Sequence, residues 1–202
     1  DLDAISSGES NGSLAWHENV DGSGLNWQSH TVASEENHAD WTHLQAADMD
    51  RDGDVDIVCS AEDHHQIVWF ENLDGSGGTW QQRYVENYFM SRGDFDVVDL
   101  DNDGDPDVVA AESFWNRVVW WRNLNGTGLV WSKHIIRAEF QGAYSVKAGD
   151  FDNDGDQDVV ARGYGKCTVY SNLNGNGIFF VLLSFSFVFF VFILPPPQGR
   201  KR

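Results

Sequence analysis

The 202-residue sequence predicts an all-β protein built from a repeated four-stranded unit, and three observations support this fold class. An acidic nine-residue motif, D-x-D-x-D-G-D-x-D, begins at Asp48, Asp99 and Asp150, so successive copies are 51 residues apart. Each copy is followed by a turn motif in which Asn-Leu precedes Asp-Gly or Asn-Gly. Short runs of β-branched and aromatic residues separate the motifs, and no stretch keeps the 3.6-residue hydrophobic period of a helix. The turn motifs are WFENLDGSG at 69–77, WWRNLNGTG at 120–128 and VYSNLNGNG at 169–177.

The complete repeat between residues 43 and 86 shows the order of elements in one unit. HLQAAD leads into the acidic loop, and VDIVCSA and QIVWFEN follow as strand-forming runs. The Asp74-Gly75 pair favours a tight hairpin before WQQRYVE. Four antiparallel strands in about 50 residues are typical of a β-propeller blade, whose faces are buried only against neighbouring blades. The expected strands lie at 43–48, 55–61, 66–72 and 80–86.

The repeats divide residues 1–177 into about three and a half blades, which form an incomplete ring. WHENVDGSG at 16–24 is an earlier copy of the turn motif, and on that register Asp1 and Asp3 are the last two Asp residues of an acidic motif. The sequence thus starts inside an acidic loop and without an initiator Met, so we expect a fragment or a processed chain of a longer array. The predicted units are a partial blade at 1–36, blades at 37–87 and 88–138, and a partial blade at 139–177.

Tryptophans recur at two positions of the repeat. Repeated aromatic residues at fixed blade positions most simply pack in the core, and we expect this of both sets. Trp41 and Trp115 have no aromatic counterpart in the other repeats, so they are candidates for ligand contact. The two recurring sets are Trp16, Trp69 and Trp120, and Trp27, Trp80 and Trp131.

The acidic loops are predicted metal sites. In such a loop the side chains at positions 1, 3, 5 and 9 turn inward, Gly at position 6 permits a sharp turn, and position 7 offers its backbone carbonyl. The alternative is a set of solvated acidic turns, but carboxylates about 4 Å apart repel each other by roughly 1–4 kcal/mol per pair. All-oxygen ligation favours Ca²⁺ over Mg²⁺ or Zn²⁺. The predicted side-chain ligands are Asp48, Asp50, Asp52 and Asp56; Asp99, Asp101, Asp103 and Asp107; and Asp150, Asp152, Asp154 and Asp158, while Asp54, Asp105 and Asp156 would offer carbonyls.

An EF-hand begins with the same letters but does not fit the sequence. It requires a bidentate Glu at position 12 and flanking helices. Position 12 is Cys59, Ala110 or Ala161, and the flanking segments have the composition of strands.

The motifs DLDNDGDPDVV, GDFDNDGDQDVV and VWFENLDGSG resemble the FG-GAP/VCBS repeat, and the resemblance covers roughly residues 1–177. That family includes the calcium-binding blades of integrin α-subunit propellers and many secreted microbial and algal proteins. The resemblance implies a propeller, usually of seven blades, with Ca²⁺ loops on one face and ligand contacts on the other. Seven blades would need about 350 residues, roughly twice what this chain supplies. The first copy departs from the pattern because it keeps only Asp1 and Asp3.

Loops that differ between repeats are the predicted recognition surface, because the scaffold does not dictate their sequence. They lie between the second and third strands and between blades, at the end of the blade opposite the acidic loops. Aromatic residues with Arg, His and Asn suit a carbohydrate or a protein partner, whereas the alternative is that they pack between blades. The candidate ligand-binding residues are Trp41, His64, His65, Arg92, Trp115, Tyr144 and Tyr164.

Composition and motifs restrict the function classes. The net charge of −19 argues against nucleic-acid binding, because phosphates require a basic surface. The sequence has no HExxH, P-loop or dinucleotide-binding motif, so we expect no catalytic activity. The prediction is a calcium-binding scaffold for extracellular adhesion or ligand recognition. The alternatives are a carbohydrate-binding propeller and the propeller part of a secreted polysaccharide lyase or other enzyme.

Two further features bear on an extracellular or cell-surface location. Asn11-Gly-Ser and Asn125-Gly-Thr are N-glycosylation sequons in predicted turns, and millimolar extracellular Ca²⁺ would fill even weak sites. Cys59 and Cys167 lie on predicted strands of different repeats, so we expect free thiols rather than a disulfide.

The segment 178–202 breaks the repeat pattern. IFFVLLSFSFVFFVFIL at 178–194 is followed by PPPQGRKR, which fits a single-pass membrane anchor with a basic cytoplasmic flank. The competing interpretation is the translation of a mis-predicted or retained intron, because Phe, Leu, Ser, Val and Pro dominate the product of a pyrimidine-rich tract. A membrane is an expected partner only under the first interpretation.

Overall fold

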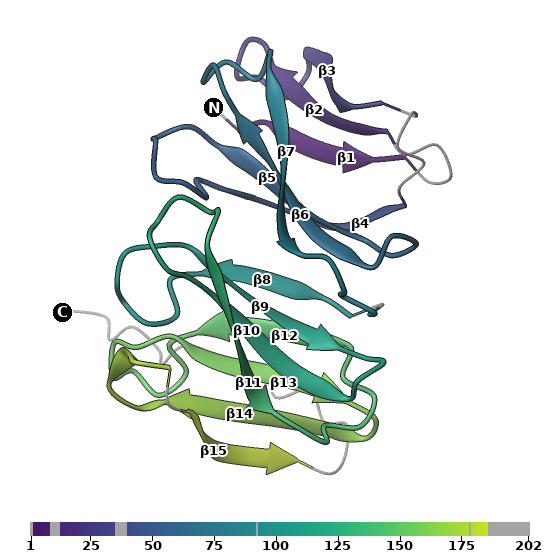
Figure 1. Cartoon of the computed structure of the whole chain (residues 1–202). Helices are drawn as coiled ribbons and strands as arrows, with labels where there is room; N and C mark the ends of the chain where they lie inside the picture. The colour runs from purple at the N-terminus through teal and green to yellow at the C-terminus, as the bar shows by residue number, and fades with distance from the viewer. Residues whose placement is uncertain (1, 9–12, 35–39, 92, 178, 186–202) are drawn as a thin grey trace, which may run out of the picture.

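The computed structural model describes residues 2–8, 13–34, 40–91, 93–177 and 179–185. Within these residues the chain forms strands β1–β15, which pair in four antiparallel sheets (Figure 1). This confirms the predicted all-β fold class, and the described sheets do not close into a ring.

Each sheet places its strands side by side in chain order, as expected for propeller blades. The first sheet contains β1 (Ala4–Ser7), β2 (Leu14–Asn19) and β3 (Trp27–Ala33). The second contains β4 (Trp41–Ala47), β5 (Asp56–Ala61), β6 (Gln66–Asn72) and β7 (Trp80–Glu86). The third contains β8 (Phe95–Val98), β9 (Asp107–Glu112), β10 (Arg117–Asn123) and β11 (Trp131–Arg137). The fourth contains β12 (Ser145–Gly149), β13 (Asp158–Gly163), β14 (Lys166–Asn172) and β15 (Phe179–Phe185), with the 3-10 turn η2 (Leu173–Gly175) before β15.

The strand β15 corrects the boundary that the sequence predicted at residue 177. It pairs with β14 from Cys167↔Phe185 to Asn172↔Phe179 and completes the fourth sheet. Backbone groups make these ladder bonds, so a run rich in Phe and Leu can replace the polar strand of the other repeats. Among the described residues no helix is long and apolar enough to cross a membrane. Residues 186–202, which hold most of the predicted anchor or intron product, lie outside the described residues.

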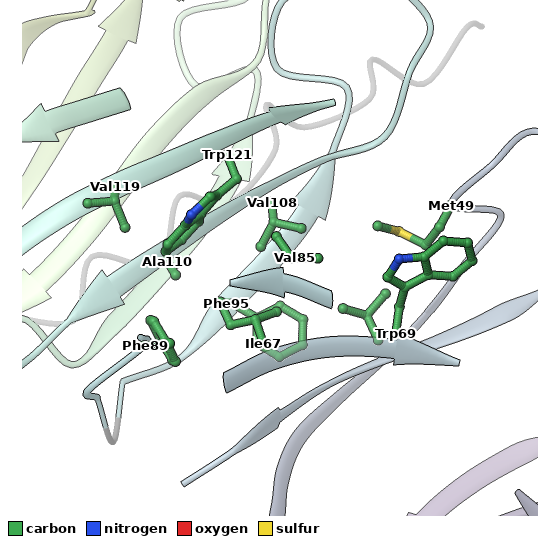
Figure 2. Close-up of a cluster of buried hydrophobic side chains, with 11 residues drawn as sticks. Met49, Ile67, Trp69, Val85, Phe89, Phe95, Val108, Ala110, Val119 and Trp121 are labelled. Carbon is green, nitrogen blue, oxygen red and sulfur yellow. The ribbon is translucent and has the colours of Figure 1, made fainter. Parts of the chain in front are cut away.

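The hydrophobic cores lie between successive sheets. Figure 2 shows the core between the second and third sheets, where Ile67 and Trp69 of β6 face Phe95 of β8 and Trp121 of β10. Phe89, in the connection between these sheets, lies edge-on to Trp121 with ring centroids 6.0 Å apart. Fully burying such side chains stabilises the fold by about 1.5–3 kcal/mol each, so neighbouring blades hold each other together.

The recurring tryptophans link one blade to the next. The indole Nε1 of Trp69 donates to the Gly128 carbonyl at 3.2 Å, and Trp131, in the next sheet, donates to the same oxygen at 2.8 Å. Gly128 has a φ of +64°, and a Cβ there would lie 2.6 Å from Cζ2 of Trp69. Trp16 and Trp80 share the Gly77 carbonyl in the same way, at 3.0 and 2.9 Å.

The prediction of core packing holds for most of these tryptophans but not for all. Trp69 and Trp120 are buried, whereas Trp27 in the first sheet is 45% exposed. No described sheet precedes the first one, so no neighbouring tryptophan covers the Trp27 hairpin. The indole Nε1 of Trp27 still donates to Gly24 within its own turn, at 2.9 Å.

Trp41 is not available to a ligand, which corrects one sequence-based candidate. Its side chain is only 4% exposed and lies in the core between the first and second sheets. The ring stands edge-on to Phe70, with centroids 5.4 Å apart. Although Trp41 is the first residue of β4, its side chain packs in this core with Leu14 of the first sheet and Phe70 of the second.

Candidate metal centre

Three acidic loops join the first and second strands of the second, third and fourth sheets. In each loop the carboxylates at positions 1, 3 and 9 converge, with one oxygen from each lying within 4.8 Å of the other two. The three groups are Asp48, Asp50 and Asp56; Asp99, Asp101 and Asp107; and Asp150, Asp152 and Asp158.

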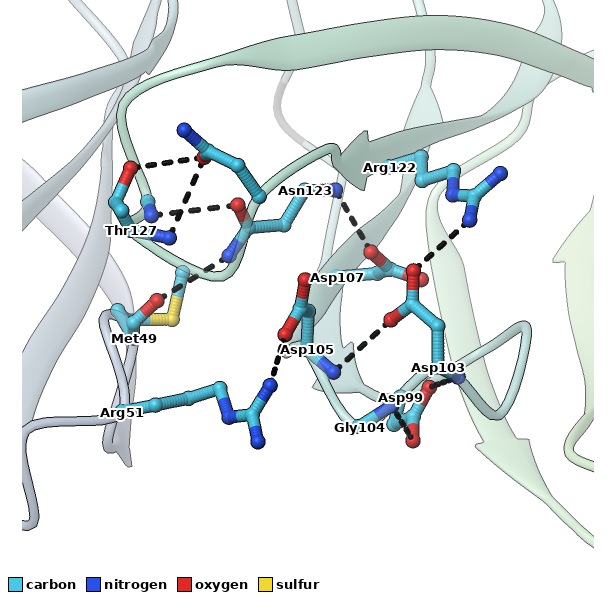
Figure 3. A network of polar contacts seen from close by, with 12 residues as sticks. Met49, Arg51, Asp99, Asp103, Gly104, Asp105, Asp107, Arg122, Asn123 and Thr127 are labelled. Carbon is cyan, nitrogen blue, oxygen red and sulfur yellow. Dashed lines mark hydrogen bonds and ion pairs between the residues drawn. The ribbon is translucent and has the colours of Figure 1, made fainter.

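Backbone contacts within each loop impose the turn. In the second loop, Asp99 accepts hydrogen bonds from the amides of Asp103 and Gly104 at 3.1 and 2.9 Å (Figure 3). Gly104 has a φ of +90°, a backbone conformation that favours glycine. The residue at position 4, Asn102, is also left-handed at +60°, as Asn tolerates better than most residues. The alternating Asp pattern therefore curls back on its first residue.

The Asp at position 9 holds the loop to the sheet. Asp107 is fully buried, and its two oxygens accept the amides of Leu100 at 3.2 Å and Asn123 at 2.8 Å. Asp56 does the same with the amides of Met49 and Asn72, at 2.8 and 2.9 Å. Burial raises the pKa of both carboxyls to about 7, although the amide hydrogen bonds act in the opposite direction. A cation bound beside these carboxylates would favour their charged form.

The donor chemistry of the convergent groups fits a calcium ion. Oδ1 of Asp48 and Oδ1 of Asp101 are buried and have no hydrogen-bond donor among the described residues. Burial and the nearby Asp52, Glu71 and Asp48 raise the pKa of Asp50, which shows how crowded the carboxylates are. Buried carboxylate oxygens without donors are the ligands that a hard cation takes.

The carboxylates at position 5 do not join the convergent groups. Each instead accepts the backbone amide of the residue at position 7 within its own loop. These bonds run from Asp54 to Asp52 at 2.9 Å, from Asp105 to Asp103 at 3.0 Å and from Asp156 to Asp154 at 3.0 Å.

The side chains at position 7 contact neighbouring groups rather than the convergent carboxylates. Arg51 of the first loop forms an ion pair with Asp105 of the second, at 2.6 Å (Figure 3). Asn102 of the second loop donates to Asp156 of the third, at 2.9 Å. The carboxylate of Asp54 lies against Gly75, where an added Cβ would be 2.6 Å from it. The acidic loops are thus connected from one blade to the next.

A residue that the sequence analysis missed lies against the second loop. The guanidinium of Arg122 on β10 places Nε 2.5 Å from Asp101 and Nη2 2.9 Å from Asp103. Glu71 on β6 and Ser171 on β14 occupy the same position of the turn motif, two residues before its Leu. Ser171 donates to Asp152 at 3.0 Å. Because side chains alternate along a strand, the position of the third strand that points towards the acidic loop could have been identified from the sequence.

The first, partial repeat retains one element of the site. Asp3 accepts the backbone amide of Asn19 at 2.9 Å, which is the contact that position 9 makes in the complete loops. Asp1 lies outside the described residues, so the prediction that concerns it has no structural counterpart.

The predicted ligand-binding residues divide into several groups. His65, Tyr144 and Tyr164 line a cavity of about 770 Å³ at the end of the blades opposite the acidic loops. His64 and Trp115 are exposed outside this lining, and Trp115 stands edge-on to Phe114. Arg92 lies outside the described residues. The lining residues that were not named as candidates are Asp40, Glu62, Asp63, Met90, Ser91, Ser113, Phe114, Asn116 and Gly142.

Two minor predictions concern modification sites and thiols. Asn125 is exposed in its turn and accepts a hydrogen bond from the Thr127 hydroxyl at 2.8 Å, whereas Asn11 lies outside the described residues. Cys59 is buried and Cys167 is half-buried, and both are free thiols.

The sequence matches the model of one protein family. The model described as FG-GAP-like repeat matches three overlapping stretches, residues 1–59, 48–110 and 99–161. The second and third matches begin at the first Asp of an acidic loop, and together the matches cover most of the chain. No curated protein in the comparison matches the chain.

Proposed function

The chain is a member of the FG-GAP-like repeat family, and on this premise we propose that it is a calcium-stabilised, non-catalytic β-propeller scaffold for adhesion or ligand recognition outside the cell. The observation that carries the proposal is the convergence of three carboxylates in each of three loops. Bound Ca²⁺ would supply a divalent charge that neutralises these groups and holds each loop in one conformation.

The residues of the chain position the ligands before any ion arrives. The buried Asp at position 9 ties its loop to the third strand of the same sheet, as Asp107 does through Asn123. The Asp at position 1 fixes the turn through the glycine amide, as Asp99 does with Gly104. Asp101, at position 3, has one buried oxygen, Oδ1, that accepts no hydrogen bond and could bind a cation.

The cavity at the opposite end supports ligand recognition. It is lined by residues of the loops before β4, β8 and β12 and of the loops between second and third strands. Phe114 and Tyr164 are 62% and 80% exposed there, beside the carboxylates of Glu62 and Asp63. Ligand sites in proteins combine aromatic surface with a few polar groups in this way.

A carbohydrate is the second candidate ligand, because the exposed ring of Tyr164 lies beside groups that can hydrogen bond hydroxyls, such as the Asn116 amide. A glycan array probed with the calcium-loaded chain tests it. Binding that Tyr164→Ala abolishes supports carbohydrate recognition, whereas a protein partner and no glycan would leave adhesion as the function.

Calorimetric titration of the metal-free chain with Ca²⁺ tests the metal part of the proposal. We expect binding at the three complete loops and a melting temperature that rises with Ca²⁺. Mg²⁺ is the comparison ion and should bind more weakly, because it demands a stricter octahedral geometry than these loops offer. A melting curve that is the same in EDTA and in Ca²⁺ would contradict calcium stabilisation.

A further inference from the structure

The three acidic loops have the same five Asp residues but different charges around them. Two guanidinium groups contact the second loop, Arg122 at Asp101 and Asp103 and Arg51 at Asp105. Among the described residues, no Lys or Arg ion pair reaches an Asp of the first or third loop. The second loop is therefore the one whose negative charge the protein already compensates.

Part of the difference arises at one position of the turn motif, two residues before its Leu. Glu71 occupies it at the first loop and adds a carboxylate, which is itself paired with Arg83 at 2.7 Å. Ser171 occupies it at the third loop and donates a neutral hydrogen bond to Asp152. Arg122 at the second loop is the only one of the three that brings a positive charge to the carboxylates.

Arg122 also occupies one oxygen each of Asp101 and Asp103. In the second loop, Asp103 accepts the amide of Asp105 with one oxygen and the guanidinium with the other. The carboxylate of Asp101 is 4% exposed and holds Arg122 through Oδ2, so only Oδ1 remains for a cation. A cation that enters this loop must share its ligands with Arg122 or displace it.

We propose that Arg122 is a built-in counter-cation of the second acidic loop, so that this loop binds Ca²⁺ more weakly than the first and third loops and keeps its fold when Ca²⁺ is scarce. The inference rests on the proposed calcium binding and assigns unequal roles to the three sites. Arg122 acts as a positioning residue, because it contacts the ligands and not the ion.

The test is a Ca²⁺ titration of the whole chain followed at the amide signals of Gly53, Gly104 and Gly155. These amides donate to the first Asp of their own loops, so each signal reports on one site. In the unmodified chain we expect Gly104 to respond last. In Arg122→Gln the second loop should bind Ca²⁺ about 3- to 10-fold more tightly, because two partly exposed ion pairs no longer compete.

A second measurement separates charge compensation from a structural role. In a chelator, Arg122→Gln should melt at a lower temperature than the unmodified chain, while its calcium affinity at the second loop rises. A merely structural residue would not raise the affinity when it is removed. Lys147→Gln removes the same charge from an ion pair with Asp96, away from the acidic loops, and should leave the Gly104 response unchanged.

Three outcomes overturn the inference. If Gly104 responds before Gly53 and Gly155 in the unmodified chain, the predicted order of affinities is wrong. If Arg122→Gln leaves the Gly104 response unchanged while all three loops bind, Arg122 is no counter-cation, although calcium binding stands. If none of the three amides responds to Ca²⁺, the proposed calcium binding fails, and this inference fails with it.

Discussion

The two ends of the blades differ in how strictly their sequences repeat. At one end the loops before β5, β9 and β13 share five Asp residues and one glycine, and their backbones make the same internal hydrogen bonds. At the other end, the loops between second and third strands read EDHH, SFWN and YG. The comparison teaches that the repeated end maintains the scaffold, while the variable end is free to acquire a ligand surface.

The physical cause is the degree of burial at each end. At the acidic end, the Asp at position 9 is buried and accepts amides from its own loop and from the third strand, so a change there disturbs both. At the cavity end, Phe114 and Tyr164 project from turns into solvent, where a substitution disturbs little. The four predictions below test this contrast, from the largest expected effect to the smallest.

Removing the metal should produce the largest loss of stability. Each occupied loop stabilises the fold by about 2.7 kcal/mol when free Ca²⁺ is 100 times its Kd, so a chelator should lower the melting temperature markedly. Scanning calorimetry in Ca²⁺ and in EGTA measures the difference. Adding Ca²⁺ back should restore the original melting curve. If the melting temperature is the same in EGTA and in Ca²⁺, the acidic loops do not stabilise the fold through a metal.

Replacing a buried Asp of an acidic loop should cost about 2–5 kcal/mol even without metal. Asp158→Ala leaves the amides of Phe151 and Asn172, which it holds at 3.0 and 2.9 Å, without their acceptor. Asp154→Ala, in the same loop, removes an exposed carboxylate with one loop amide as partner and should cost less. Urea unfolding of both variants in EGTA gives the comparison, and equal losses would contradict the anchoring role of position 9.

The metal-free chain should lose stability as the pH rises from about 4 to about 7. The pKa of Asp56 and Asp107 is raised to about 7 by burial in the folded chain, against about 3.9 in an unfolded one. Between these values the folded state binds more protons, so each carboxyl destabilises it by up to about 1.4 kcal/mol per pH unit, and the loss ends above pH 7.

Calcium should reverse this dependence, because the ion binds only the deprotonated carboxylates. The melting temperature in Ca²⁺ minus that in EGTA should therefore be larger at pH 8 than at pH 5.5. A difference that stays constant across this range would show that Asp56 and Asp107 do not titrate with the metal.

A substitution in the cavity should change stability least. Tyr164→Ala removes an exposed side chain, so we expect a change within about 0.5 kcal/mol, together with loss of any ligand that binds the cavity. Tyr84→Ala, an exposed tyrosine on the outer strand β7, is the matched control and should retain ligand binding. If Tyr164→Ala destabilises the fold by several kcal/mol, the cavity end also maintains the scaffold, which contradicts the proposed difference between the two ends.

Much of the fold could be predicted because the repeat is local. The strands expected at 66–72 and 80–86 coincide with β6 and β7, since the Asp74-Gly75 turn sets the hairpin between them. The convergence of Asp48, Asp50 and Asp56 follows from nine consecutive residues. The alternation of Asp residues along such a short loop can be recognised in a single sequence.

Contacts between blades could not be predicted in this way. The partnership of Arg51 with Asp105 and the burial of Trp41 join residues of different repeats. Which side chain of one sheet meets which of the next depends on the stacking of the sheets, and no local period encodes that stacking. The lining of the cavity has the same origin, because three blades contribute to it.

The sequence by itself determined the all-β repeat, the positions of the acidic loops and the identity of the clustered carboxylates. Each of these depends on short motifs of consecutive residues that recur along the chain. Only the tertiary structure decided that β15 completes the fourth sheet, that Trp41 is core and that Arg122 neutralises one loop of the three. These features depend on backbone pairing and side-chain contacts between strands. Such contacts exist only once the sheets are formed and stacked.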